Sequence, residues 1–358
     1  MNAPLRPRTL TELAEAVRSV PRIVAVGAGT KPRLFAEEGT RLSTAGLTGL
    51  VEYEPEEFTF TALAGTALRD LAEALAARGQ YLPFDPPWVA AGATLGGAVA
   101  SGLSGPGRYR FGGIRDFILG VRFVDGAGRL LRLGGKVVKN AAGFDVPKFL
   151  CGSLGRFGVI GEVTFKVFPR PVSALTLRLH AADPVERLKI IRALGRSRWE
   201  PEAVEGVPDH CDLWIRLAGP ESALAALASE ILTRFPGRRE TGPEDPLEAL
   251  REMSWAAASD TWVKVPLSPD HSVAFTTELA ALDGVSHQVG AGGSVGWIAL
   301  RESASVPDVR DLLERFGLEG MTVRGDAPLW WARRPRPAIE SAVKLALDPC
   351  HRFPPLDS

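Results

Sequence analysis

The first 80 residues alternate between helical and strand-like spacings of apolar residues. Apolar positions three and four residues apart predict a helix through Val17, with Thr9 or Thr11 as its N-cap, and Pro21 ends it. A second amphipathic helix follows, with Thr66 as its predicted cap. Short apolar runs predict strands at 22–26, 49–54 and 58–64.

The stretch from residue 92 to residue 161 is dense in glycine and alternates loops with strands. Residues 125–128 (DGAG) indicate a hairpin, because glycine supplies the positive φ that a tight turn needs. Residues 169–171 (PRP) follow the last strand and indicate a domain boundary. The strands predicted here are 117–124, 130–133 and 159–168.

Beyond residue 171 glycine becomes rarer, and strands alternate with helices. This pattern is typical of an α+β layer with antiparallel pairing. No internal repeat is apparent, and a last helix is predicted over 338–347. The other elements predicted are strands at 173–180, 212–217, 262–265 and 295–300, and helices at 184–196, 221–235 and 308–316.

Length and composition are those of a globular protein. A chain of 358 residues is too long for one ordinary core, so we expect two domains. The formal net charge is +0 and the basic residues are dispersed, which argues against binding to nucleic acid or to an anionic bilayer. No apolar run approaches the roughly 20 residues that span a membrane, and no secretory signal is apparent. We therefore expect a cytoplasmic protein.

Cysteine and histidine are sparse and scattered. The three cysteines are far apart, which makes a disulfide framework improbable, and no CxxC spacing could hold an iron–sulfur cluster. The five histidines never pair at metal-ligand spacing, so no metal site and no catalytic residue is predicted. Tryptophans gather in the second half, where they can serve either the core or an interface; among them are Trp255, Trp262, Trp297, Trp330 and Trp331.

A first glycine loop, Gly27-Ala28-Gly29-Thr30-Lys31, directly follows a predicted strand. Two glycines there present bare backbone N–H groups, which suit a phosphate. Pro32 stands where a Rossmann fingerprint requires its third glycine, and a Walker A loop is absent. A plain turn at the end of a strand is the alternative reading of so short a motif.

Two further glycine clusters strengthen the case for a ligand. Residues 93–102 (ATLGGAVASG) hold tiny residues where a helix normally has bulky ones, at roughly 1 kcal/mol per glycine. Either a large ligand lies against this backbone, or a helix packs tightly against a sheet. A third cluster covers 139–145 and 152–160, and one extended cofactor explains all three clusters together.

The segments that contain these clusters resemble a known protein family. The segments ATLGGAVASGLSGP, IRDFILGVRFVDGAGRLLRLGGKVVKNAAGFD and GSLGRFGVIGEVTFKVFPRP resemble the FAD-binding domain of the vanillyl-alcohol-oxidase/PCMH flavoprotein superfamily. Within it they are most similar to the FAD-binding E subunits of bacterial glycolate oxidases. The resemblance implies an α+β fold: a PCMH-type FAD-binding domain of two α+β subdomains over 1–171, then a smaller ferredoxin-like cap domain over 172–337. Residues 338–358 would form a C-terminal helix and a tail that returns to the FAD domain.

The resemblance also implies which residues bind FAD. The 27–31 loop would cradle the pyrophosphate, and Val159 and Ile160 would contact the adenosine end. Gly112 or Gly113 would approach the isoalloxazine. Lys139 would lie near the flavin pyrimidine edge, or it is a solvated surface lysine. The residues implied are Gly27, Ala28, Gly29, Thr30, Lys31, Thr94, Gly96, Gly97, Ser101, Gly112, Gly113, Lys139, Val159 and Ile160.

One departure from the family bears on how the flavin is attached. Many relatives bind it covalently through a histidine in the first loop, where this chain has Thr30. Threonine cannot form that bond, so the resemblance implies non-covalent FAD.

The function implied is that of a redox subunit in a glycolate oxidase-like complex, which oxidises a small 2-hydroxy acid such as glycolate. Its partners would be a catalytic FAD subunit and an iron–sulfur subunit, which could hold it at the inner face of a membrane. One alternative is a free-standing FAD-dependent oxidase or dehydrogenase that acts on a 2-hydroxy acid or another alcohol. Another is a scaffold that has lost its flavin, although intact glycine loops argue against it.

Overall fold

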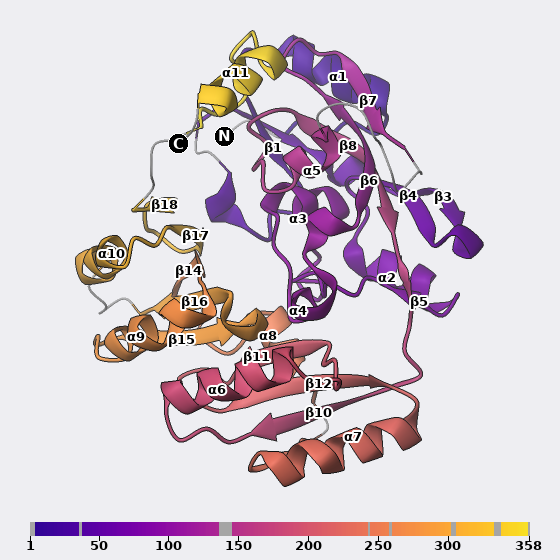
Figure 1. The fold of residues 1–358 in the computed structure, drawn as a ribbon. Helices are drawn as coiled ribbons and strands as arrows, with labels where there is room; N and C mark the ends of the chain where they lie inside the picture. Colours follow the sequence, from indigo (N-terminus) through magenta and orange to yellow (C-terminus); the bar gives the residue numbers. More distant parts are fainter. Residues whose placement is uncertain are drawn as a thin grey trace. The chain divides into compact units, whose positions relative to one another are not determined.

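The protein divides into two compact units. The computed structural model describes residues 4–35, 38–135, 145–242, 244–257, 260–301, 306–332 and 338–356. The first unit comprises residues 1–104, 113–170 and 335–358, and the second comprises 105–112 and 171–334. Figure 1 shows the chain and labels its elements.

The first unit starts with helix α1 (Leu10–Ser19), whose cap is Thr9 and not Thr11. The Thr9 hydroxyl accepts a hydrogen bond from the Glu12 N–H, which satisfies one of the free donors at the helix start. The apolar face of α1 packs on a core that includes the short parallel strands β1 (Ile23–Val26) and β2 (Thr40–Ser43).

A five-stranded antiparallel sheet forms the rest of the first unit. Its strand order is β3-β4-β8-β6-β7. The predicted hairpin is confirmed: β6 pairs with β7, and Gly128 in the turn has φ 76°. The strands are β3 (Leu50–Glu54), β4 (Thr59–Leu63), β6 (Ile118–Val124), β7 (Leu130–Gly134) and β8 (Val159–Lys166), with a separate pair β5 (Gln80–Tyr81) and β9 (Phe168–Pro169).

The helices of the first unit connect these strands. The predicted Thr66 cap is wrong, because Ala67 is the N-cap of α2 (Leu68–Ala76). The Thr66 hydroxyl instead donates to the Leu63 carbonyl at 2.7 Å, within the turn that leaves β4. The remaining helices are α3 (Leu95–Ser101), α5 (Val146–Leu150) and α11 (Ala338–Leu347).

The second unit contains the same motif twice. Strands β10, β11, β12 and β13 form a sheet in the order β11-β12-β10-β13, and β14 to β17 repeat this order as β15-β16-β14-β17, with β18 added at the edge. Each set runs β-α-β-β-α-β along the chain, which is the ferredoxin-like arrangement. The expected fold class is therefore confirmed, but the motif occurs twice. The sequence shows no repeat because the two copies share strand order and not residues.

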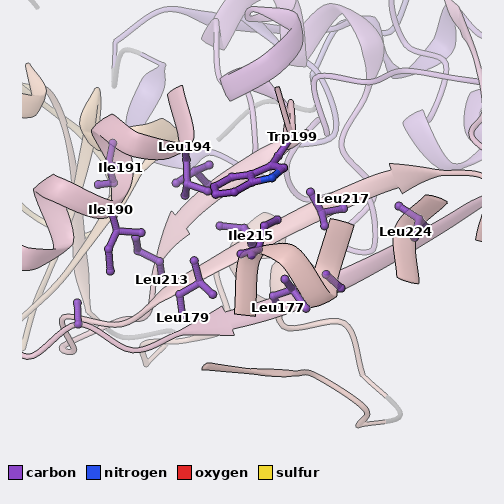
Figure 2. Packing of buried hydrophobic residues seen from close by; sticks show 14 residues of the cluster. Leu177, Leu179, Ile190, Ile191, Leu194, Trp199, Leu213, Ile215, Leu217 and Leu224 are labelled. Carbon is purple, nitrogen blue, oxygen red and sulfur yellow. The ribbon is translucent and has the colours of Figure 1, made fainter. Parts of the chain in front are cut away.

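Each copy has its own core. Figure 2 shows the first, in which leucines and isoleucines of β10, β12, α6 and α7 pack into one cluster with Trp199. The second core includes Trp331, and Trp262 is equally buried, each being 1% exposed. Both therefore serve the interior and not a surface.

The elements of the first copy are β10 (Ser173–Leu179), α6 (Pro184–Gly195), β11 (Ala203–Gly206), β12 (Leu213–Gly219), α7 (Glu221–Arg234) and β13 (Gly237–Arg239). Those of the second are β14 (Thr261–Pro266), α9 (Pro269–Leu279), β15 (Val285–Gly290), β16 (Val295–Leu300), α10 (Val306–Arg315), β17 (Gly320–Arg324) and β18 (Trp330–Trp331). Helices α4 (Arg108–Phe111) and α8 (Pro246–Arg251) complete the unit. None of the helices that the structure describes is long and apolar enough to cross a membrane.

Candidate functional site

A pocket in the first unit is walled by three segments that are far apart in sequence. They are the loop that leaves β1, helix α3, and residues 153–160 at the start of β8. The space measures about 700 Å³, including the part open to solvent. The lining is mostly apolar or backbone, so a ligand would meet few charged groups.

Most of the predicted site residues meet in this pocket. Those that line it are Gly27, Ala28, Gly29, Thr30, Lys31, Thr94, Gly96, Gly97, Ser101, Val159 and Ile160. Gly112 and Gly113 do not line it, since they lie where the chain passes from the second unit back to the first. Lys139 lies outside the described residues.

Several lining residues were not singled out by the sequence. Ser153, Gly155 and Gly158 belong to the third glycine cluster, which was recognised as a whole without assigning them individually. The glycine-rich pattern that contains these three residues was therefore visible in the sequence. Thr44 and Phe35 also line the pocket, but they carry no motif that could have identified them.

The 27–31 loop is shaped by Gly29 and by contact with α3. Gly29 has φ 77°, a conformation that side chains with a Cβ rarely adopt. A Cβ on Gly27 would lie 2.5 Å from Thr94 Oγ1, so only glycine allows the loop to approach the cap of α3. Within the described chain, the backbone N–H groups of residues 27–31 donate no hydrogen bond. They are available to an anion.

The two adjacent glycines of α3 have different surroundings. A Cβ on Gly96 would lie 2.7 Å from the Ala64 Cβ, so Gly96 makes the tight helix–sheet contact. A Cβ on Gly97 would meet only Thr94 Oγ1, at 3.0 Å. Among the described residues, Gly97 therefore approaches the cap of α3 closely and not the sheet, and both glycines line the pocket.

Lys31 supplies positive charge to the pocket. Its side chain is 7% exposed, and its Nζ lies 3.2 Å from Thr30 Oγ1 and 5.2 Å from the centre of the Trp88 ring. No described carboxylate forms an ion pair with it. Burial lowers the pKa of Lys31 from 10.5 to about 8. Because this buried cation has no counter-charge among the described residues, it favours the binding of an anion.

Ser153 offers an unused hydroxyl in the same pocket. The residue is 5% exposed, and its Oγ has no hydrogen-bond partner among the described residues. A buried hydroxyl without a partner is unfavourable, so a polar ligand atom would satisfy it. No group of three His, Cys, Asp or Glu side chains in the described chain is placed to hold a metal ion.

These features fit a large dinucleotide with a charged diphosphate, and the comparison with known families agrees. Residues 2–134 match the FAD binding domain family. The match covers a little over a third of the chain and supports FAD as the cofactor.

Two curated relatives indicate the closer kinship. The chain is 38% identical over 226 residues to glycolate oxidase subunit GlcE of Escherichia coli strain K12, which covers 62% of this chain and 63% of that protein. It is 28% identical over 183 residues to glycolate oxidase subunit GlcD of Bacillus subtilis strain 168, covering 49% of this chain and 39% of that protein. The matches thus span less than two thirds of either relative.

A solved structure shares the fold across nearly the whole chain. Alkyldihydroxyacetonephosphate synthase superposes with a TM-score of 0.68, covering 98% of this chain and 75% of that one. Sequence identity is 16%, so the likeness concerns the fold alone. It confirms the PCMH-type architecture expected from the sequence.

Proposed function

We propose that this chain is the FAD-binding redox subunit of a glycolate oxidase-type complex and takes part in oxidising a small 2-hydroxy acid. The observation that carries the proposal is the pocket of the first unit, where glycine loops surround a buried lysine and a serine hydroxyl that has no hydrogen-bond partner in the described part of the chain. The similarity to GlcE supports the type of complex.

Each wall of the pocket has a part in holding FAD. The Lys31 ammonium and the N–H groups of the 27–31 loop offset the negative charge of the diphosphate. Gly97 leaves room for the ribityl–phosphate chain beside α3, along with Thr94 and Ser101, and Gly96 holds the helix against β4. The Ser153 hydroxyl donates to a phosphate or ribityl oxygen.

The adenosine end and the reactive end are assigned to other residues. Val159 and Ile160 contact the adenosine, while Gly112 or Gly113 approaches the isoalloxazine. The resemblance assigns Lys139 to the pyrimidine edge, but this residue is outside the described part of the chain. The bound flavin supplies the capacity to accept a hydride from an alcohol carbon.

FAD is held without a covalent bond, because Thr30 cannot provide one. Heating the purified protein and separating the released cofactor by chromatography tests this point. We expect free FAD in the supernatant. Flavin that stays with the precipitated chain, or FMN in place of FAD, would contradict the assignment.

The substrate chemistry is completed by partners. The cysteines lack the spacing of iron–sulfur ligands, so electrons leave this flavin to an iron–sulfur subunit. A second, catalytic FAD subunit binds the 2-hydroxy acid, and the assembly is held at the inner face of a membrane through these partners. Residues 172–337 form the cap domain, and 338–358 return to the FAD domain.

Co-expression with a catalytic flavin subunit and an iron–sulfur subunit tests the complex. We expect co-purification, bleaching of the flavin absorbance on addition of glycolate, and slow turnover by the isolated chain. Glycolate oxidation by the isolated chain at the rate of the complete assembly would instead establish the free-standing dehydrogenase.

A further inference from the structure

Helix α11 reverses the usual arrangement of an amphipathic helix. Its lysine, Lys344, is 9% exposed, whereas Ile339 and Leu345 are 65% and 58% exposed. A surface helix normally buries its apolar residues and leaves its lysines in water. The interactions of Lys344 within the first unit explain the reversal.

Three acceptors surround the Lys344 ammonium. Nζ donates to the Arg156 carbonyl at 2.5 Å, to Asp348 Oδ2 at 2.8 Å and to the Phe353 carbonyl at 3.2 Å. An ammonium has three donors, so this one is fully used. Asp348 is 0% exposed, and it also accepts from the Phe353 N–H at 3.0 Å. The buried ion pair is therefore satisfied on both sides.

One of these contacts reaches a wall of the FAD pocket. Arg156 belongs to the 153–160 segment, and the chain holds it at two atoms. Its carbonyl accepts from Lys344, and its Nε donates to the Pro355 carbonyl at 3.0 Å. The C-terminal tail thus fixes the middle of this segment.

The same tail reaches a second wall of the pocket. The Ile23 N–H donates to the Arg352 carbonyl at 2.7 Å, and the Arg352 guanidinium donates to the Val20 carbonyl. Ile23 begins β1, which leads directly into the 27–31 loop. Asp348 Oδ1 accepts from the Arg352 N–H at 2.8 Å, so a single carboxylate links Lys344 to this second attachment.

We propose that Lys344 is a positioning residue for the cofactor: through Asp348 and the tail 348–355 it holds the 27–31 loop and the 153–160 segment at the spacing that FAD requires. This inference rests on the proposed placement of FAD between those walls. Lys344 itself is not among the pocket-lining residues, so it acts through the backbone that it anchors. Pre-organised walls bind more tightly because less conformational entropy is lost on binding.

The test measures FAD affinity and the stability of the apoprotein separately, in the full-length chain. Lys344→Met removes the three hydrogen bonds but leaves Asp348 buried and unpaired, which can unfold the chain. Lys344→Met with Asp348→Leu removes the charge pair together. Lys344→Arg keeps the charge but changes the shape of the donor group. Leu345→Met, on the exposed neighbouring residue, is the matched control.

Apoprotein is titrated with FAD while flavin fluorescence is followed, and thermal unfolding is recorded without FAD. For the double variant we expect an FAD dissociation constant about 10- to 100-fold above wild type, with a visible circular dichroism spectrum of the bound flavin that also differs. Lys344→Arg should fall between wild type and the double variant. Leu345→Met should match wild type in both measurements.

The outcomes distinguish a positioning role of Lys344 from a purely structural one. Wild-type FAD affinity and flavin spectrum in the double variant, or in Lys344→Arg should the double variant not fold, would overturn the positioning role. A lower unfolding temperature with unchanged affinity would leave Lys344 a purely structural residue and would equally overturn it. Failure of wild type and Leu345→Met to bind FAD would instead refute the proposed FAD site.

Discussion

Replacing Lys31 with methionine should stabilise the apoprotein and weaken its binding of FAD. In the folded apoprotein, burial lowers the pKa of Lys31 from 10.5 to about 8. A shift of that size corresponds to about 3 kcal/mol of unfavourable free energy at neutral pH. Methionine keeps most of the apolar stem but loses the contact of the cation with the Trp88 ring, which is worth about 1 kcal/mol. We therefore expect the free energy of unfolding of the apoprotein to rise by about 2 kcal/mol.

The same substitution should act in the opposite direction on FAD. Charge-assisted hydrogen bonds contribute about 1.5–3 kcal/mol, so the FAD dissociation constant should increase about 10- to 100-fold. The matched control is Lys166→Met, because Lys166 also lies over aromatic rings, 5.2 Å from Phe117, but outside the pocket. Its FAD affinity should equal that of wild type.

The pH dependence gives an independent check. The pKa of Lys31 in the folded apoprotein lies below its unfolded value, so between about pH 8 and pH 10.5 the unfolded chain binds more protons. Apoprotein stability should therefore rise with pH through that window. Below pH 8 the buried charge of Lys31 should destabilise the apoprotein to its full extent. FAD binding should weaken above about pH 8, by up to about tenfold per pH unit, because the neutral lysine must regain a proton to meet the diphosphate.

Urea unfolding of the apoprotein and fluorescence titration with FAD between pH 6.5 and 9.5 provide both measurements. In Lys31→Met the pH dependence of both should flatten. An unchanged FAD affinity in Lys31→Met, together with a wild-type pH profile, would refute the role of this lysine. A less stable Lys31→Met apoprotein would show that the buried cation has a compensating interaction.

Further predictions separate the groups of the pocket. Gly96→Ala should lower the free energy of unfolding by about 1–3 kcal/mol, since its Cβ would collide with Ala64. Gly97→Ala should change stability less, because its Cβ would meet only the Thr94 hydroxyl, at 3.0 Å, and it should weaken FAD binding. Thermal unfolding and FAD titration distinguish the two variants, and equal behaviour of the two would contradict the assignment. Ser153→Ala should raise the FAD dissociation constant about three- to tenfold. It should not destabilise the apoprotein, because the hydroxyl has no described hydrogen-bond partner to lose. A destabilised apoprotein with normal FAD binding would contradict this role of Ser153.

Much of the first unit could be predicted from the sequence. A cap at Thr9 or Thr11, the hairpin at 125–128 and most of the strands follow from local rules, because capping hydrogen bonds and positive φ angles depend on a few neighbouring residues. Only the structure selects Thr9 as the cap. The glycine clusters and the superfamily resemblance were likewise readable, since a phosphate loop requires a contiguous run of small residues.

Local rules could not predict that Gly96 and Gly97 have different surroundings, or that Lys31 is buried. These properties depend on Ala64, Trp88 and Thr94, which come from other elements. The duplicated motif of the second unit was missed for a related reason. Strand order is a property of pairing, and many different apolar residues can fill the same positions in two cores.

The sequence by itself therefore determined the type of cofactor and the segments that line the pocket. Only the tertiary structure showed how those segments are held together. The contacts of Lys344 with Arg156 and of Arg352 with Ile23 join residues 188 and more than 300 positions apart. Such contacts form only when the chain packs. Closing such long loops costs conformational entropy, and burial of the whole core offsets that cost, whereas local sequence preferences do not.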